Sequence, residues 1–143
     1  MSCLLGATCS DGWVRHTTSC FRVIYKPTLK WVDARRVCQD LAADLPIIRS
    51  VTENNFIFNL ITKQERVTHH GTWLGLYRKA DTKFYWIDDT PLGGQYSAWG
   101  SEEPNSYLEK CAHVYATGPT PGKWNDISCS TNIPVVLCQK AIS

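Results

Sequence analysis

The cysteines constrain this chain more than any other feature. Its 143 residues include seven of them: Cys3, Cys9, Cys20, Cys38, Cys111, Cys129 and Cys138. So many cysteines in one small domain are typical of a disulfide framework formed in an oxidising compartment. Zinc is the alternative use, but zinc sites usually contain close pairs such as C-x2-C. No two cysteines here lie closer than six positions apart, so we expect disulfides.

The spacing does not decide which cysteines pair, because six of them can combine in about 15 ways. Seven is an odd number, so one thiol is left over. Cys3 is the natural candidate because it lies near a terminus. Two interpretations of Cys3 stay open: a bond to a second chain, which gives a disulfide-linked homodimer, or a free thiol.

The composition predicts one globular domain of ordinary kind. The chain is 43% hydrophobic and 20% charged, enough to form a buried core. The net charge is +2 and the basic residues are spread out, which argues against a nucleic-acid partner. No apolar run approaches the roughly 20 residues that span a bilayer, so we expect no membrane insertion. Because disulfides favour a secreted, extracellular protein and residues 3–7 are too short for a secretory signal, we expect that a signal has been removed.

The hydrophobic pattern predicts an α+β fold. A helical apolar stripe over residues 28–41 places Cys38 on the buried side, and Ser50 with Glu53 forms a capping box at the start of a second helix. Residues 89–110 are polar and predict a long loop, a type of segment that is often functional. Short runs rich in β-branched and aromatic residues predict strands at 20–25, 72–77, 83–88, 111–116 and 135–140.

The end of this loop, SEEPNSYLEKC at residues 101–111, holds three glutamates close together. Like charges at such spacing repel unless water screens them or a cation lies among them. Further oxygen-bearing side chains follow at Asn125 and Asp126, directly after Trp124. Calcium takes six to eight oxygen ligands of these types, so the two clusters are candidates for one calcium site.

The chain resembles the C-type lectin-like domain over residues 9–140, which leaves 1–8 as an N-terminal extension and 141–143 as a tail. The motifs that carry the resemblance are CSDGWVRHTTSC (9–20), WVDARRVC (31–38), TWLGLY (72–77), EPN (103–105), WND (124–126) and LC (137–138). The first is similar to the N-terminal hairpin of the family's long form. The resemblance implies two helices, antiparallel sheets, a long calcium-binding loop and three disulfides: Cys9–Cys20, Cys38–Cys138 and Cys111–Cys129.

The resemblance also implies a calcium site. Its five side-chain ligands would be Glu103, Asn105, Glu109, Asn125 and Asp126, and the Glu103–Pro104 peptide bond would be cis. Many family members bind a second calcium through acidic residues at the positions of Ser106 and Lys110. Neither residue here is a carboxylate, so we expect one functional calcium.

The same five positions would bind sugar, since each can serve calcium and a hydroxyl together. In this family the EPN motif goes with equatorial vicinal hydroxyls, as in mannose, N-acetylglucosamine, glucose and fucose. Tyr107 is a further candidate sugar contact, and its alternative is a plain exposed loop residue. His113 could also reach the sugar site, although a histidine on a strand is more often structural.

The sequence therefore predicts a secreted, calcium-dependent lectin whose partners are glycans with mannose-type terminal sugars, with a role in glycan or microbe recognition in innate immunity. The alternative is a lectin-like domain that binds a protein, ice or mineral surface, because fold does not fix function. We do not expect an enzyme, since the chain lacks G-x-S-x-G, H-E-x-x-H and phosphate-loop motifs.

Overall fold

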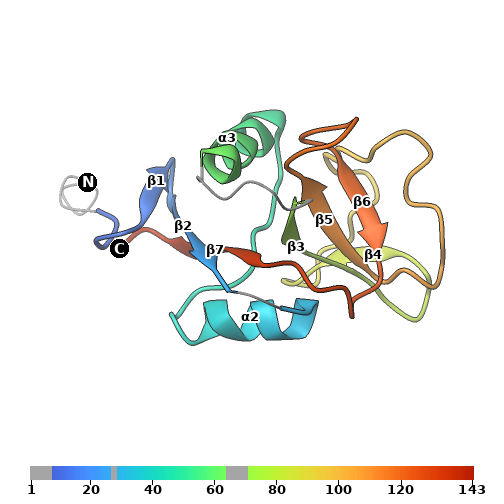
Figure 1. Cartoon of the computed structure of the whole chain (residues 1–143), viewed down its shortest axis with the longest axis horizontal. Helices are drawn as coiled ribbons and strands as arrows, with labels where there is room; N and C mark the ends of the chain where they lie inside the picture. The colour runs from blue at the N-terminus through green and yellow to red at the C-terminus, as the bar shows by residue number, and fades with distance from the viewer. Residues whose placement is uncertain (1–7, 27–28, 64–70) are drawn as a thin grey trace.

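The computed structural model describes residues 8–26, 29–63 and 71–143 (Figure 1). The expected α+β architecture is confirmed. The elements within these ranges are β1 (Val14–His16), β2 (Ser19–Tyr25), α2 (Trp31–Gln39), α3 (Val51–Thr62), β3 (Gly71–Arg78), β4 (Phe84–Trp86), β5 (Cys111–Tyr115), β6 (Trp124–Ile127) and β7 (Val135–Ala141).

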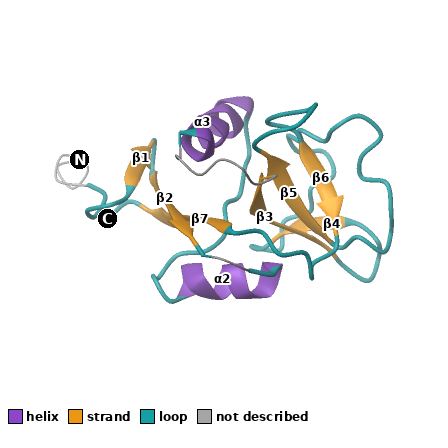
Figure 2. Ribbon diagram, viewed as in Figure 1, coloured by secondary structure: helices purple, strands orange, loops and turns teal. Residues whose placement is uncertain are grey.

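The strands form two antiparallel sheets. One has the order β1-β2-β7, and the other has the order β4-β3-β5-β6. In the first sheet Ser19 pairs with Ala141, so the last strand of the chain lies beside an early one. Figure 2 shows this sheet extending toward the C-terminus at one end of the molecule. The four-stranded sheet and the long loop after β4 lie at the other end.

Both helices form where the sequence predicts them. In α2, Ala34 and Cys38 are completely buried, as the apolar stripe requires. The capping box of α3 is present, since Ser50 Oγ accepts a hydrogen bond from the Glu53 amide at 3.2 Å. The Glu53 carboxylate reaches back one residue beyond the expected partner and accepts from the Arg49 amide at 2.7 Å. The first contact satisfies a backbone N–H of the first turn of α3, and the second satisfies the backbone N–H just before the N-cap residue.

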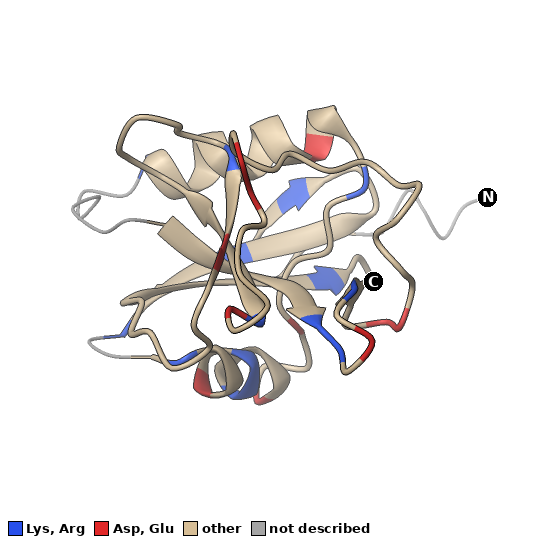
Figure 3. Ribbon diagram, turned by 90° about the vertical axis from the view of Figure 1, so that its right-hand side faces the viewer, with Lys and Arg blue, Asp and Glu red and all other residues tan. Residues whose placement is uncertain are grey.

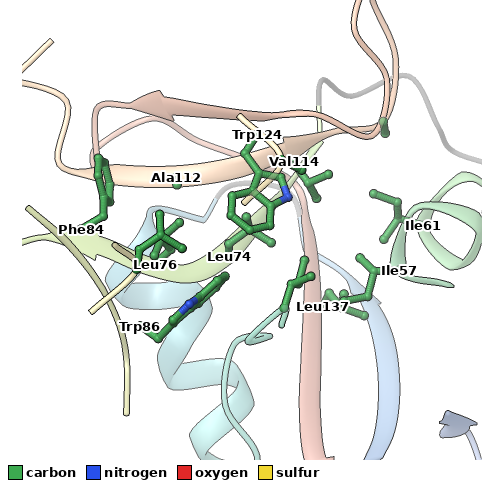
Figure 4. Packing of buried hydrophobic residues seen from close by; sticks show 14 of the residues in the cluster. Ile57, Ile61, Leu74, Leu76, Phe84, Trp86, Ala112, Val114, Trp124 and Leu137 are labelled. Atoms are coloured by element: carbon green, nitrogen blue, oxygen red, sulfur yellow. The ribbon is translucent and has the colours of Figure 1, made fainter. Parts of the chain in front are cut away.

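The main core lies between α3 and the four-stranded sheet (Figure 4). Trp124 is completely buried at its centre, and its ring stands edge-on to Trp86 with the ring centroids 5.6 Å apart. The Trp124 indole N–H also donates to Asn54 Oδ1 of α3 at 2.8 Å. Because Trp124 directly precedes Asn125 and Asp126, this packing fixes the backbone from which two of the predicted ligands extend.

The three disulfide pairings are those that the resemblance implies. Cys9–Cys20 closes the N-terminal hairpin, Cys38–Cys138 joins α2 to β7, and Cys111–Cys129 joins the start of β5 to the segment after β6. Closing the 100-residue separation of Cys38 and Cys138 stabilises the fold by about 4–5 kcal/mol on a chain-entropy account. Cys3 lies outside the described residues, so both interpretations of it remain open.

Strand β6 is not among the strands predicted from the sequence. Its burial alternates, but the buried positions are Trp124 and Asp126, while Asn125 and Ile127 are partly exposed. A strand whose inward face carries a carboxylate does not show the usual apolar alternation. In the described parts of the chain, no helix combines the length and the apolar character needed to cross a membrane.

Candidate metal and sugar site

The long loop after β4 has two halves that are held differently. Residues 89–100 pack onto the core: Leu92 and Ala98 are buried, and the Ala98 carbonyl accepts from the Trp124 amide at 2.8 Å. Residues 101–110 lie mostly at the surface and contain the EPN motif. Figure 3 views this side of the molecule and shows basic and acidic segments interspersed on it.

Asp126 fastens the second half of the loop to β6. Its side chain is completely buried, and both carboxylate oxygens accept from the Asn105 amide at 3.0–3.1 Å. Its Oδ2 also accepts from the Ser106 amide at 3.1 Å and from Arg78 Nη2 at 3.2 Å. A buried carboxylate is stable only when it is paired in this way. The contacts bring EPN and WND, which lie about twenty residues apart, into one site.

Glu103 is the least satisfied group of the site. The Glu103–Pro104 peptide bond is cis, as the resemblance implies. Glu103 Oε1 is buried and has no hydrogen-bond partner within the described residues. Burial, followed by the hydrogen bond and negative charge of Asp126 and the charge of Glu109, raises the pKa of Glu103 to about 7. The site therefore disfavours the ionised form of this carboxyl group when no cation is present.

Glu109 shares the same environment. Burial raises the pKa of Glu109, and the nearby Asp126 carboxylate raises it further, while the charge of Arg78 opposes both. Three carboxyl groups thus lie close enough for their negative charges to interact. This is the electrostatic condition that a bound divalent cation relieves.

Asn125 is held from the side by a buried histidine. Its Nδ2 lies 3.2 Å from His113 Nε2 on the neighbouring strand β5. His113 is 1% exposed and its ring contacts those of Trp73 and Tyr115. An amide has two N–H groups and a carbonyl oxygen, so this contact leaves one N–H and the oxygen for a ligand. His113 is therefore a buried residue that contacts Asn125, and it is not an exposed sugar contact.

The donor set fits calcium. All its side chains carry oxygen, one carboxylate oxygen is buried without a partner, and burial together with the neighbouring carboxylates raises the pKa values of Glu103 and Glu109. Among the described residues, no three His, Cys, Asp and Glu side chains form a metal-binding group. In the metal-free chain Glu103, Glu109 and Asp126 therefore do not already converge on one point, since the Asp126 carboxylate accepts from two backbone amides and from Arg78.

Two further residues complete the surroundings of the site. Tyr107 is 71% exposed, and the Arg78 guanidinium lies 5.4 Å from its ring centroid. Sequence reasoning missed Arg78 altogether. The available signal was an arginine at the end of TWLGLYR, a strand in which all positions but one are buried, because a charge in such a strand needs a partner.

Comparison with known proteins defines the class. Residues 27–140 match the family model described as Lectin C-type domain. This match covers most of the chain, and the chain therefore belongs to the C-type lectin domain family.

Individual relatives agree with this assignment. A perlucin-like protein of Mytilus galloprovincialis is 31% identical over 140 residues, which is 95% of this chain and 85% of that protein. The carbohydrate-recognition domain of cow CD23, solved in the presence of GlcNAc2Man3 oligosaccharide, has a TM-score of 0.80 and 28% identity, with 96% and 98% of the two chains covered.

Other matches show that the fold alone does not determine what such a domain binds. A calcium-independent type II antifreeze protein shares the fold, with a TM-score of 0.78, 24% identity, and 96% and 98% of the two chains covered. The chain spans 38–62% of the length of three other curated relatives that it matches. These three curated relatives are named as C-type lectin domain proteins and a receptor, so the domain belongs to a class of binding modules and is not an enzyme.

Proposed function

We propose that residues 9–140 form a calcium-dependent carbohydrate-recognition domain of the long form, which binds terminal sugars with equatorial vicinal hydroxyls. The observation that carries the proposal is Glu103, a loop carboxylate with a buried, unpartnered oxygen beside Asp126. A buried group of this kind is costly unless a ligand satisfies it. A binding role explains why the loop tolerates it.

Each of the five side chains has a part in this proposal. Calcium, when bound, supplies coordination positions for two sugar hydroxyl oxygens. Glu103 and Asn105 form one pair of hydroxyl acceptor and donor, and Glu109 and Asn125 form the second. Asp126 is the fifth proposed calcium ligand, and in the metal-free chain its carboxylate holds the Asn105 backbone against β6.

The mannose class is the favoured sugar because the motif reads EPN. The cow CD23 domain, which has a TM-score of 0.80 to this chain, was solved with an oligosaccharide that contains mannose. Three disulfides favour an oxidising, extracellular location for the domain. Recognition of glycans, including those of microbes, is the role that these features support.

A glycan array with calcium and with chelator tests the proposal. We expect binding to mannose-type sugars that disappears in chelator. The matched variant Glu103→Gln with Asn105→Asp converts EPN to QPD, which in this family goes with galactose, and we expect its preference to shift accordingly. Glycan binding that persists in chelator contradicts the calcium requirement. Binding to protein, ice or mineral with no glycan binding supports the alternative class.

A further inference from the structure

Arg78, the last residue of β3, lies at the base of the ligand loop and is not one of the predicted ligands. Its side chain is 6% exposed, against 0% for Asp126, to which it is ion-paired. Arginine keeps its charge under all ordinary conditions. The fold therefore contains a permanent positive charge buried directly beneath the candidate calcium site.

The Arg78 guanidinium binds four oxygen atoms from three parts of the chain. Nε donates to the Glu109 carbonyl at 3.3 Å, and Nη1 donates to the Thr82 carbonyl at 2.8 Å. Nη2 donates both to the Ser106 carbonyl at 3.1 Å and to Asp126 Oδ2 at 3.2 Å. Two of these acceptors belong to the ligand loop, one to the turn after β3 and one to β6.

Two aromatic rings enclose the same guanidinium. Its Cζ lies 4.4 Å from the ring centroid of Phe84 and 5.4 Å from that of Tyr107. A cation over an aromatic face gains further stabilisation when it is shielded from water. The planar guanidinium suits this arrangement because it can donate along its edge while its faces contact the rings.

The oxygen atoms around Arg78 are of the kind that calcium binds, three carbonyls and one carboxylate. Ser106 and Lys110, in the same loop, lack the carboxylates that a second calcium would need. We propose that Arg78 is a positioning residue, an internal cation that holds Ser106, Glu109 and Asp126 in place without any metal ion. This positioning role is independent of the proposed function. Only a further consequence, that one calcium ion is enough for binding, rests on the proposed function.

Three loop amides report on this role of Arg78 in the metal-free protein. The amides of Asn105 and Ser106 both donate to Asp126, and the Glu109 amide donates to the Ser106 carbonyl. If Arg78 holds Asp126 and the Ser106 carbonyl, these three amides are protected from exchange in chelator. Removing the guanidinium leaves the buried Asp126 without its cationic partner, so the loop opens.

Hydrogen exchange in chelator tests this with four proteins: wild type, Arg78→Gln, Arg78→Lys and the control Arg49→Gln. Arg49 is also ion-paired, with Asp88, but its side chain is 39% exposed, and its partners Asp88 and Thr90 lie outside residues 101–110. We expect Arg78→Gln to speed exchange of the three loop amides by about tenfold or more, while sheet amides of β5 are unchanged. Lysine keeps the charge but cannot reach four acceptors, so we expect an intermediate increase. The control should match wild type.

Equal exchange of the loop amides in wild type and Arg78→Gln would overturn the proposal, and so would unprotected loop amides in wild type. If Arg78→Gln also loses protection of the sheet amides, wild type is compared with Arg78→Lys instead. Loop amides that exchange as slowly in Arg78→Lys as in wild type then overturn the proposal. None of these measurements uses calcium or sugar. A chain that binds neither ligand contradicts the proposed function and leaves the role of Arg78 standing.

Discussion

The two halves of the long loop are held by different forces. Residues 91–100 are held by burial: Leu92 and Ala98 are 7% and 6% exposed, and the ring of Trp99 packs 5.9 Å from that of Trp124. The polar contacts of this half lie at its start, where Asp89 pairs with Lys79. Residues 101–110 are held by charge and hydrogen bonds, through Arg78 and Asp126. Apolar packing is indifferent to ions and pH, whereas charged contacts respond to both. The candidate ligands of the loop thus lie in the half whose contacts respond to ions and pH. The other half, whose apolar contacts do not respond to them, supports it.

The largest expected effect comes from removing the anchor of the first half. Trp124→Ala deletes an indole that contacts the rings of Trp86, Tyr96 and Trp99. We expect the free energy of unfolding to fall by about 3–5 kcal/mol. Urea denaturation in chelator measures this loss, and the loss in calcium should be at least as large, because Trp124 also fixes the backbone of Asn125 and Asp126.

The matched control lies in the second half. Leu108 is 86% exposed, so Leu108→Ser should change the free energy of unfolding by no more than about 0.5 kcal/mol. If calcium restored the stability of Trp124→Ala, the first half would depend on the ion as well, and the contrast between the halves would be wrong.

The second-largest expected effect, on calcium affinity, tests how the Asn125 side chain is held in place. His113→Phe keeps a ring in the buried position but removes the nitrogen that lies 3.2 Å from Asn125 Nδ2. We expect calcium affinity to fall by about 10–100-fold, as when the residue behind a metal ligand is lost. Isothermal titration measures this.

The control for His113 is Tyr115→Phe, which keeps the ring that contacts His113 and should leave calcium affinity unchanged. An unaltered affinity in His113→Phe would show that Asn125 keeps its orientation without the histidine.

These contrasts also explain how far the sequence alone reached. Local pattern was enough for α2, α3 and most strands, because their apolar faces repeat with the period of the element. It failed at β6, where Asp126 faces inward, and at Arg78, which ends an apolar strand. Each residue is buried because partners distant in the sequence satisfy it, and the two, which pair with each other, lie 48 positions apart. Local periodicity cannot reveal such pairing between distant residues. Motif order names five candidate ligands, and these stay a prediction.

The pH dependence of calcium binding comes next in size. In the metal-free protein the pKa of Glu103 is raised to about 7, so calcium must displace a proton below that pH. Affinity should therefore fall by about tenfold from pH 8 to pH 6 and level off above pH 8. Proton release on adding calcium to unbuffered protein measures this directly, with about one proton expected at pH 6 and almost none at pH 9.

The same shift affects stability without calcium. Because the pKa of Glu103 is higher in the folded chain than its usual 4.5, its contribution to stability is complete below pH 4.5 and is lost as the pH rises through 7. The apolar contacts of Leu92, Ala98 and Trp99 in the first half should show no such dependence. Equal calcium affinity at pH 6 and pH 8 would contradict the assignment of Glu103 as a ligand.

The smallest expected effect concerns Tyr107, whose ring stands at the surface of the second half. The Arg78 guanidinium lies 5.4 Å from its centroid and restrains it, while 71% of the residue stays exposed. A restrained ring beside a sugar site can pack against the apolar face of a sugar at little entropic cost. Tyr107→Ala should therefore weaken binding of a mannose-type sugar by about two- to fivefold, and Tyr107→Phe should not. Leu108→Ala, which truncates an even more exposed apolar side chain at the next position, should bind as wild type does. If Tyr107→Ala also binds as wild type does, the ring is an ordinary exposed residue, and sugar binding depends on the five oxygen-bearing side chains alone.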